Sequence, residues 1–522
     1  MRTRSLATML VYCAAFALCI AGCGASGSII HLSKPPVLPG TPGPPWFGFA
    51  GNAQHSALSQ QASQPLARIH WRAAVDLAPQ YQFGELLAHY GSVTVTHADN
   101  VIVPVKTGPT GGFRVDVRSP VNGAPIWSAS SDYRLPAHGW VPSFNPSLTP
   151  ENRLYFPGAG GKLFYRDDPD AASGSVKIAV FYGAAKYENA KAVYDDNVRI
   201  DTPITTDPQG DAFFGFTVVG STPAGLHSGV ARIGADGTGS WVSAATAAGD
   251  ASITEVAMNC APALSQDLHT LYVVVSNATP GAFAGNGYML ALDSTTLATV
   301  GKAFLRDPQS ELPANIADDA SASPTVGPDG DVYYGVLENP FPKHNGRGWL
   351  LHFDSTLAQT KIPGSFGWDD TASIVPASMV PSYAGTSSYL IMTKYNNYGG
   401  VNLGDGKNRL AILDPNATEP DLVYGNPVMQ EVLTILGVTP DPNYPGGVKE
   451  WCINTAAVDP ATDSVLADSE DGYLYRWDLP SNSFTQRIQL TSGVGEAYTP
   501  TVVGADGQVY AVNNAVVFAL GQ

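Results

Sequence analysis

The sequence predicts an all-β protein: an eight-bladed β-propeller of four-stranded antiparallel blades, closed by an N-terminal strand. Three observations lead to this prediction. A short pattern of proline, an apolar pair, a tight turn and a second apolar run returns along the chain. The 54 glycines and 41 prolines suit many turns, and a charged fraction of only 14% suits a large core. Apolar residues alternate with other residues between the turns, as in strands buried between sheets.

The clearest copy of the pattern is "SPTVGPDGDVYYG", residues 323–335. Related segments begin at Asn145, Thr202, Ala261, Val380 and Thr499, a weaker one begins at Thr455, and residues 91–105 form an upstream unit. Most of the shared prolines recur at spacings of 57–62 positions, and the last spacing, 119, spans two periods. A fixed period that contains several strands is typical of a propeller.

Four strands are predicted inside one unit, lettered A to D from the axis outward. In the unit from Ser323, A is residues 325–326, B is 331–337, C is "GWLLHFD" and D is a short strand near "QTKI". Asp-Gly in the turn "GPDG" favours a tight hairpin. The eighth unit lacks its outermost strand, and residues 66–77 are predicted to supply it and so close the ring. A plain N-terminal strand is the alternative for that segment.

The first residues predict export and lipid attachment. Arg2 and Arg4 precede an apolar stretch, residues 6–20, that is too short to span a bilayer. The following "IAGC" resembles the bacterial lipobox, which makes Cys23 the lipidated residue and residues 1–22 the signal peptide. Residues 23–60, with "KPPVLPGTPGPPW", are predicted to be a semi-rigid tether, and residues 61–522 the propeller. Gly24 in place of Asp favours the outer membrane, with the protein facing the periplasm or the cell surface.

Net charge limits the possible binding partners, and cysteine content limits the possible disulfide bonds. The formal net charge of −17 argues against a nucleic-acid or anionic-membrane surface, since both need basic patches, and the lipid anchor is the expected membrane contact. After signal removal and lipidation, only Cys260 and Cys452 remain as thiols. In an oxidising compartment they could form a disulfide, and the alternative is two separately buried cysteines.

The chain resembles the PQQ-like (quinoprotein) propellers. Blade one ends "VDVRSPVNGAPIW", with Gly123 four positions before Trp127, and "LDSTTL" and "FDSTL" follow other C strands. These segments are similar to degenerate tryptophan-docking motifs of that family. The resemblance covers residues 66–522 and implies its fold. Relatives at this level include scaffolds of the BamB type and PQQ-dependent alcohol dehydrogenases.

Loop lengths predict which face carries function. The A–B and C–D turns are short, whereas B–C loops and D–A connections, which emerge on the same face, are long. We call that face the long-loop face, and binding residues usually gather where loops are long. Polar and aromatic residues precede its inner strands. The candidate ligand-binding set is Asp201, Asn259, Asp319, Asp370, Lys394, Asn396, Trp451, Asn454, Glu496 and Tyr498.

A ring of carboxylates at the channel mouth predicts a cation site. Asp319, Asp370 and Glu450 are the candidate metal ligands, and Ca²⁺ is the candidate ion because it takes six to eight oxygen ligands. Aromatic neighbours could instead hold a cationic or sugar-like ligand. The structural alternative is that each Asp or Asn only caps its own turn.

The sequence contains no catalytic motif that identifies a reaction. The chain has no H-E-x-x-H, C-x-x-C or G-x-S-x-G motif. It also lacks the adjacent cysteines that the resemblance implies for a PQQ site, so PQQ is not expected; Glu450, Asn454 and Asp370 are suitable residue types without matching motifs. We therefore expect a binding or scaffold protein that takes a protein or small ligand on its long-loop face. The alternative is an enzyme with its site in the channel, either a quinoprotein-like oxidoreductase or a lyase or hydrolase.

Overall fold

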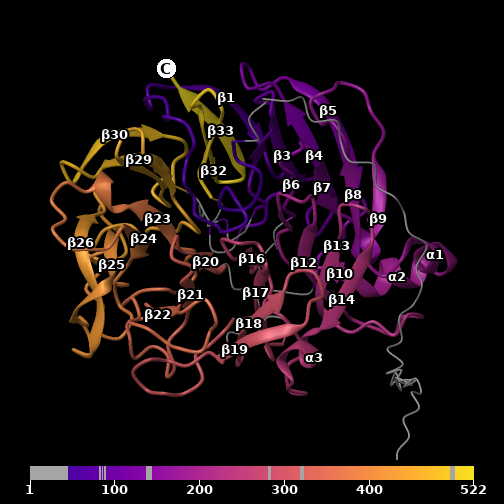
Figure 1. Ribbon diagram of the computed structural model, residues 1–522. Helices are drawn as coiled ribbons and strands as arrows, with labels where there is room; N and C mark the ends of the chain where they lie inside the picture. Colours follow the sequence, from indigo (N-terminus) through magenta and orange to yellow (C-terminus); the bar gives the residue numbers. More distant parts are fainter. Residues whose placement is uncertain are drawn as a thin grey trace, which may run out of the picture.

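Eight antiparallel sheets stand around one axis, which confirms the eight-bladed propeller (Figure 1). The computed structural model describes residues 45–522 apart from 82, 83, 85, 87–89, 137–143, 280–283, 318–321 and 494–499. Inner strands such as β16 (Ala263–Leu264) and β20 (Thr325–Val326) lie near the centre of Figure 1, and outer strands such as β19 (Thr299–Phe304) lie at the rim.

The first four blades follow one another along the chain, and each begins at its inner strand. Blade one is β2 (Thr94–Val95), β3 (Val101–Lys106), β4 (Phe113–Arg118) and β5 (Pro125–Ser131). Blade two is β6 (Ser147–Leu148), β7 (Leu154–Pro157), β8 (Lys162–Arg166) and β9 (Lys177–Val180). Blade three is β10 (Val198–Ile200), β11 (Thr205–Thr206), β12 (Ala212–Val218), β13 (Gly229–Ile233) and β14 (Gly239–Ser243). Blade four is β15 (Glu255–Val256), β16, β17 (Thr270–Ser276), β18 (Gly287–Asp293) and β19.

The last four blades complete the ring. Blade five is β20, β21 (Val332–Val336) and β22 (Trp349–Phe353). Blade six is β23 (Ser373–Pro376), β24 (Tyr389–Tyr395), β25 (Arg409–Pro420) and β26 (Pro427–Leu436). Blade seven is β27 (Ala457–Asp459), β28 (Ser464–Asp468), β29 (Tyr473–Asp478) and β30 (Ser483–Gln489). Blade eight is β31 (Val502–Val503), β32 (Val509–Asn513), β33 (Val516–Gly521) and β1 (Arg68–Ala74).

The two ends of the described chain close the ring as predicted. β1 pairs antiparallel with β33, from Arg68 opposite Gly521 to Ala74 opposite Val516. Trp71 of β1 is buried, and a Cβ built on Gly123 would lie 2.6 Å from its ring, so that glycine lets blade one approach the closing strand. The closure gives blade eight its fourth strand and joins the two ends of the described chain in one sheet.

Blades also dock through side chains. The Nε1 of Trp127, in the motif noted in the sequence, donates to the carbonyl of Pro169 in blade two at 2.7 Å, and the guanidinium of Arg166 lies 3.9 Å from its ring centroid. This contact joins blade one to blade two as a tryptophan-docking motif would.

Two details of the blades differ from the sequence-based expectation. The inner strand of blade six is β23, so the copy placed at Val380 is wrong in register and lies in the connection to β24. Blade five has single bridges, Phe353 to Thr360 and Leu350 to Gly364, where a fourth strand was expected. The short helices α1 (Ala184–Asn189), α2 (Lys191–Asn197) and α3 (Ala244–Ala248) and the 3-10 turns η1 (Ala159–Gly161) and η2 (Ala377–Met379) lie in connections.

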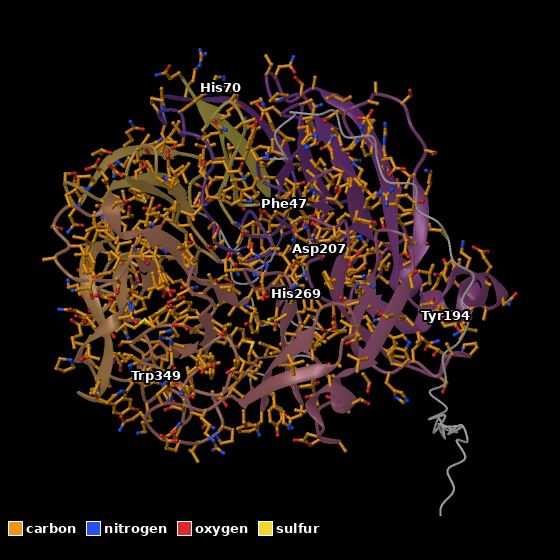
Figure 2. The ribbon with its side chains drawn as sticks, in the orientation of Figure 1. Phe47, His70, Tyr194, Asp207, His269 and Trp349 are labelled. Carbon is orange, nitrogen blue, oxygen red and sulfur yellow. The ribbon has the colours of Figure 1, made fainter. Side chains whose placement is uncertain are left out.

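Residues 45–64 form a hub around the axis. Their backbone carbonyls accept N–H groups from inner strands of blades one, two, four, five, six and seven, at 2.7 to 3.0 Å. The acceptors are Trp46, Phe47, Ala53, Gln54, Ser56 and Ala57, and the donors are Val95, Leu148, Leu264, Val326, Ile374 and Val458. Phe47 is labelled near the centre of the ring in Figure 2. The hub thus satisfies inner edges that would otherwise keep unpaired N–H groups.

The hub corrects the expected domain boundary. Residues 45–60 were assigned to the tether, whereas the structure builds them into the propeller, with Trp46 and Ala57 completely buried. Ala50, His55 and Ala57 have positive φ, so the segment turns repeatedly and follows neither a helical nor a strand period. Within the described part of the chain, no helix is long and apolar enough to cross a membrane.

Candidate functional site

Four segments of the long-loop face meet between blades six and seven. Asp369 and Asp370 precede β23, Lys394 lies near the end of β24, and Glu450 and Cys452 lie in the connection from β26 to β27. Glu470 follows β28 in the next B–C turn. We call the following residues the six–seven cluster: Asp369, Asp370, Lys394, Tyr398, Glu450, Cys452 and Glu470. The structure therefore brings together three residues that the sequence singled out, Asp370, Lys394 and Glu450.

The centre of the cluster is a convergent set of possible metal ligands. One ligand atom each from Glu450, Cys452 and Glu470 lies within 4.8 Å of the other two. A Glu470 oxygen also accepts the backbone N–H of Glu450 at 3.2 Å and lies 3.5 Å from Nζ of Lys449. Among the described residues, no other group of three or more Cys, His, Asp or Glu side chains has ligand atoms this close together. Glu450 and Glu470 are half-buried, so the set lies just below the surface.

Burial and like charge hold protons on the carboxyl groups. Burial, and then the charge of Glu470, raise the pKa of Glu450 to about 8, although Lys394 and Lys449 act in the opposite direction. Burial also raises the pKa of Asp370 to about 7, against the effects of Lys394 and of a hydrogen bond from Thr393. Such shifts arise because a low-dielectric site disfavours the charged carboxylate.

The lysine in the cluster does not neutralise it. The Nζ of Lys394 lies 4.0 Å from an Asp369 oxygen, and both side chains are buried. Burial raises the pKa of Tyr398 well above its usual range, with Glu450 and Cys452 adding to the effect. The cluster thus contains four carboxyl groups against two ammonium groups, Lys394 within it and Lys449 beside Glu470, and a cationic ligand would relieve that imbalance.

Asn396 and Trp451 position the cluster. The Nδ2 of Asn396 donates to the carbonyl of Trp451 at 3.1 Å, and the Trp451 N–H donates to Oδ1 of Asn396 at 3.2 Å. The Trp451 ring is buried in the core, 5.4 Å from Tyr475 and 5.7 Å from Phe484. It therefore anchors the segment that carries Glu450 and is not exposed as an aromatic surface for a ligand.

The polar residues before the other inner strands join neighbouring blades through backbone hydrogen bonds. The N–H of Asn259 donates to the carbonyl of Asp201 at 2.8 Å, and the N–H of Thr371 donates to the carbonyl of Asn454 at 2.8 Å. Asp201, Asn259 and Asn454 are all buried. Asp201 and Asn259 lie at the seam of blades three and four, so the structure does not bring them to the six–seven cluster. Asp319, Glu496 and Tyr498 lie outside the described residues.

The two cysteines are buried thiols and do not form the disulfide with each other. Cys260 packs in the core of blades four and five, and burial raises the pKa of its thiol to about 12. Cys452 belongs to the six–seven cluster. They lie in different seams of the ring, because one precedes β16 and the other precedes β27.

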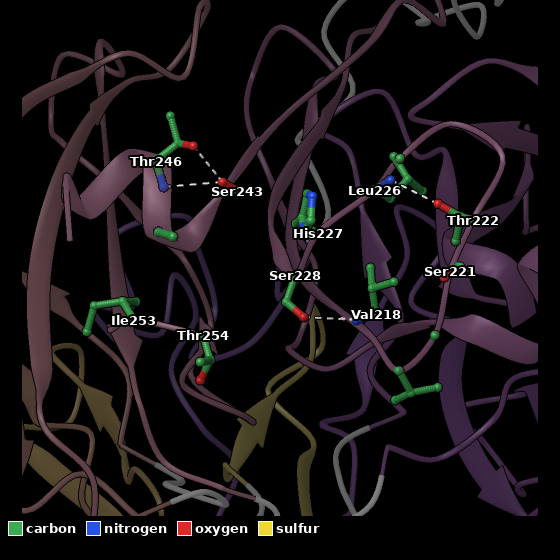
Figure 3. A pocket seen from close by; sticks show the side chains of 14 residues that line it. Val218, Ser221, Thr222, Leu226, His227, Ser228, Ser243, Thr246, Ile253 and Thr254 are labelled. Carbon is green, nitrogen blue, oxygen red and sulfur yellow. Dashed lines mark hydrogen bonds between the residues drawn. The ribbon is translucent and has the colours of Figure 1, made fainter. Parts of the chain in front are cut away.

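A hollow that sequence reasoning missed lies between the B–C loop of blade three and α3 (Figure 3). Its volume is about 810 Å³. None of the 14 residues that line it is Asp, Glu, Lys or Arg, and several hydroxyls form local hydrogen bonds, such as Ser228, which accepts the N–H of Val218 at 3.0 Å. The loop 219–228 is rich in Gly, Ser and Thr, which gave no chemical signal in the sequence.

No protein-family model matches the chain, and no curated protein matches it in sequence. Among solved structures it is similar to a europium-containing methanol dehydrogenase, with 11% identity, a TM-score of 0.55, and coverage of 90% of this chain and 89% of that one. A quinohemoprotein alcohol dehydrogenase from Comamonas testosteroni shares 11% identity at a TM-score of 0.53, over 92% and 81% of the two chains. BamB from Moraxella catarrhalis shares 12% identity over 86% and 98%, at a TM-score of 0.42. The first two likenesses confirm the quinoprotein-like propeller fold, and at these identities they show the fold alone.

The six–seven cluster does not fit the quinone cofactor that the fold family implies. PQQ is a tricarboxylate, so its site needs cationic side chains that can pair with it. The six–seven cluster has the opposite balance, because its four carboxyl groups outnumber Lys394 and the neighbouring Lys449.

Proposed function

We propose that the protein is a lipid-anchored binding propeller of the bacterial cell envelope, and that the six–seven cluster binds a cationic ligand. One observation carries the proposal: the ligand atoms of Glu450, Cys452 and Glu470 converge within 4.8 Å on the long-loop face. Like-charged groups are costly to hold together in a half-buried position, and a bound cation offsets that cost.

The donor set favours a particular class of cation. A thiolate with two carboxylates suits Zn²⁺, which accepts sulfur and oxygen ligands in a tetrahedral site. Ca²⁺, the ion expected from the sequence, takes oxygen ligands only, so Cys452 makes it the weaker candidate here. With three protein ligands, a zinc ion would keep one position for a group from a partner or a small ligand, as a binding site requires.

Anchoring belongs to the same proposal. Acyl chains on Cys23 would hold the protein at the outer membrane, and residues 24–44 would separate the hub from the bilayer. The long-loop face would then be free to meet a protein or small ligand in the periplasm or outside the cell. The net charge of −17 supports a partner that presents cationic groups and opposes nucleic acid.

Calorimetric titration of the purified full-length protein with ZnCl₂ tests the proposal. We expect one zinc ion to bind with proton release, because Glu450 and the Cys452 thiol must lose protons. Glu450→Gln and Glu470→Gln should each weaken binding about tenfold or more. Glu188→Gln changes an exposed glutamate on α1 and should leave binding unchanged. Equal binding by all four proteins, or none by the wild type, would refute the site.

One observation favours a second candidate, a hydrolase or lyase. At neutral pH, the pKa of about 7 leaves Asp370 near half-protonation, and the pKa of about 8 leaves Glu450 mostly protonated, so the two groups can act as base and acid toward a substrate. Incubation with peptidoglycan and polysaccharide fragments would decide: turnover that Asp370→Asn abolishes supports the enzyme, and binding without turnover supports the receptor.

A further inference from the structure

Four blades carry a tyrosine at one equivalent position of the second strand, opposite the first residue of the inner strand. They are Tyr155, Tyr272, Tyr333 and Tyr510. The hydroxyl of Tyr155 contacts an arginine at 3.4 Å, that of Tyr272 donates to a backbone carbonyl at 2.7 Å, and that of Tyr333 bonds Tyr389 at 2.6 Å. The hydroxyl of Tyr510 is buried and has no hydrogen-bond partner among the described residues. The seam of blade eight therefore differs from the three equivalent seams.

The A–B turns show what is different. In blade five, Tyr389 of the next blade donates its hydroxyl to Asp329, and a Cβ built on Gly327 would lie 2.6 Å from that hydroxyl oxygen and 2.9 Å from Asp329 Oδ1. In blade eight, a Cβ built on Gly504 would lie 3.0 Å from an oxygen of Asp99 and 3.5 Å from Asp506 Oδ1. The aspartate of the turn is retained, because Asp506 in "GADG" matches Asp329 in "GPDG".

Asp99 of blade one therefore occupies the place that the Tyr389 hydroxyl fills in blade six. Where blades five and six meet, Asp329 faces a hydrogen-bond donor, the Tyr389 hydroxyl. Where blades eight and one meet, Asp506 faces a second carboxylate, that of Asp99. Burial, and the charge of Asp506, raise the pKa of Asp99 to about 6, although the N–H of Ala505 donates to it at 2.7 Å. Near neutral pH the two carboxylates repel each other unless a cation lies between them.

A further unpaired oxygen lies beside the pair. Gln508 is 5% exposed; its backbone N–H donates to one Asp506 oxygen at 2.8 Å and its Nε2 to the other at 3.5 Å, whereas its Oε1 has no partner among the described residues. Tyr510, completely buried, feels the charges of both Asp99 and Asp506. Buried oxygens without partners are costly, so their gathering at one carboxylate pair points to a ligand that supplies positive charge.

We propose that Asp99, Asp506 and Gln508 bind a divalent cation, Ca²⁺, which joins the first blade to the last. Carboxylate and amide oxygens are the hard ligands that Ca²⁺ takes, and no sulfur or imidazole from these residues would favour a transition metal. Asp506 is exposed, so water completes the coordination. The ion adds a second closure to the ring, next to the ladder between β1 and β33.

Thermal unfolding of the full-length protein at pH 7.5, in 10 mM CaCl₂ and in EDTA, tests this site. By mass action, we expect calcium to raise the wild-type melting temperature by about 1–3 °C. Asp99→Asn and Asp506→Asn should each abolish the shift, and Asp99→Asn should melt no lower than the wild type in EDTA because it removes the repulsion. Asp99 has a φ of 65°, a conformation that asparagine tolerates.

Two controls isolate the seam. Asp329→Asn changes the equivalent turn of blade five and should keep the full calcium shift. Glu450→Gln should keep it as well, so failure of the zinc site and failure of this site are separate results. A wild type that does not respond to calcium, or an Asp99→Asn variant that responds as the wild type does, would overturn the proposal.

Discussion

Replacing Glu450 by glutamine should change how stability depends on pH. The pKa of Glu450 is about 8 in the folded protein, against an ordinary value of 4.5 in the unfolded chain. Between these values the folded state retains a proton that the unfolded state has lost, so the free energy of unfolding falls as pH rises. Below pH 4.5 the group contributes nothing, and above pH 8 the whole loss is present.

The size of the effect follows from the shift. One pKa unit is worth about 1.4 kcal/mol, so the full shift would correspond to about 5 kcal/mol. Glu450 is half-buried, and water that reaches it lowers the cost of its charge. We therefore expect Glu450→Gln to be more stable than the wild type by about 2 kcal/mol at pH 9, and nearly equal to it at pH 5.

Thermal unfolding at pH 5, 7 and 9, in buffers with a chelator, measures this difference. The expected gain in melting temperature at pH 9 is about 2–4 °C. Glu188→Gln, on the exposed face of α1, should show no such trend. If the difference between Glu450→Gln and the wild type is the same at all three pH values, the like-charge account of the cluster is refuted.

Three further predictions concern the anchor, the hub and the blade packing. Cys23→Ser should release the protein from membranes into the soluble fraction, and membrane association that survives a salt wash would contradict the lipid anchor. Trp46→Ala should lower the free energy of unfolding by about 3–5 kcal/mol, because Trp46 is completely buried where the hub meets blade one; a loss below about 1 kcal/mol by denaturant titration would contradict that role. Gly335→Ala should cost about 3 kcal/mol or more, since its Cβ would lie 1.9 Å from the carbonyl oxygen of Gly367, and an unchanged melting temperature would refute this packing.

The blades were predictable because their signal is local and repeated. The Asp-Gly turn and the alternating apolar residues predicted the inner strand at residues 325–326, where β20 lies. The missing outer strand of blade eight led to the prediction of β1, which pairs with β33. The predicted position of the inner strand was wrong in blade six. Pro381 matches the proline of the repeat, but it lies in the connection after β23. A short motif cannot specify register when the true inner strand carries no proline before it.

The hub could not be predicted, because its stability comes from long-range pairing. Residues 45–64 have no apolar period, and their carbonyls bond to inner strands distributed over most of the chain. Sequence composition favoured a tether for the same residues. Only the closed ring, with inner N–H groups facing the axis, shows why this segment is held.

The candidate site was predictable in part. Position before an inner strand identified Asp370 and Glu450, but it also selected Asp201 and Asn259, whose backbones stitch blades three and four. Glu470 was missed because it lies in a short B–C turn, on the face where only long loops were considered. Cys452 was read as a disulfide candidate, and its place between two glutamates depends on how blades six and seven meet.

The most direct test of the central claim is zinc X-ray absorption on the metal-loaded full-length protein. If the six–seven cluster holds the ion, the spectrum will contain one sulfur neighbour at about 2.3 Å together with oxygen neighbours at about 2.0–2.2 Å. Cys452→Ser should remove the sulfur contribution. A wild-type spectrum with oxygen and nitrogen neighbours alone would place the ion elsewhere and contradict the account.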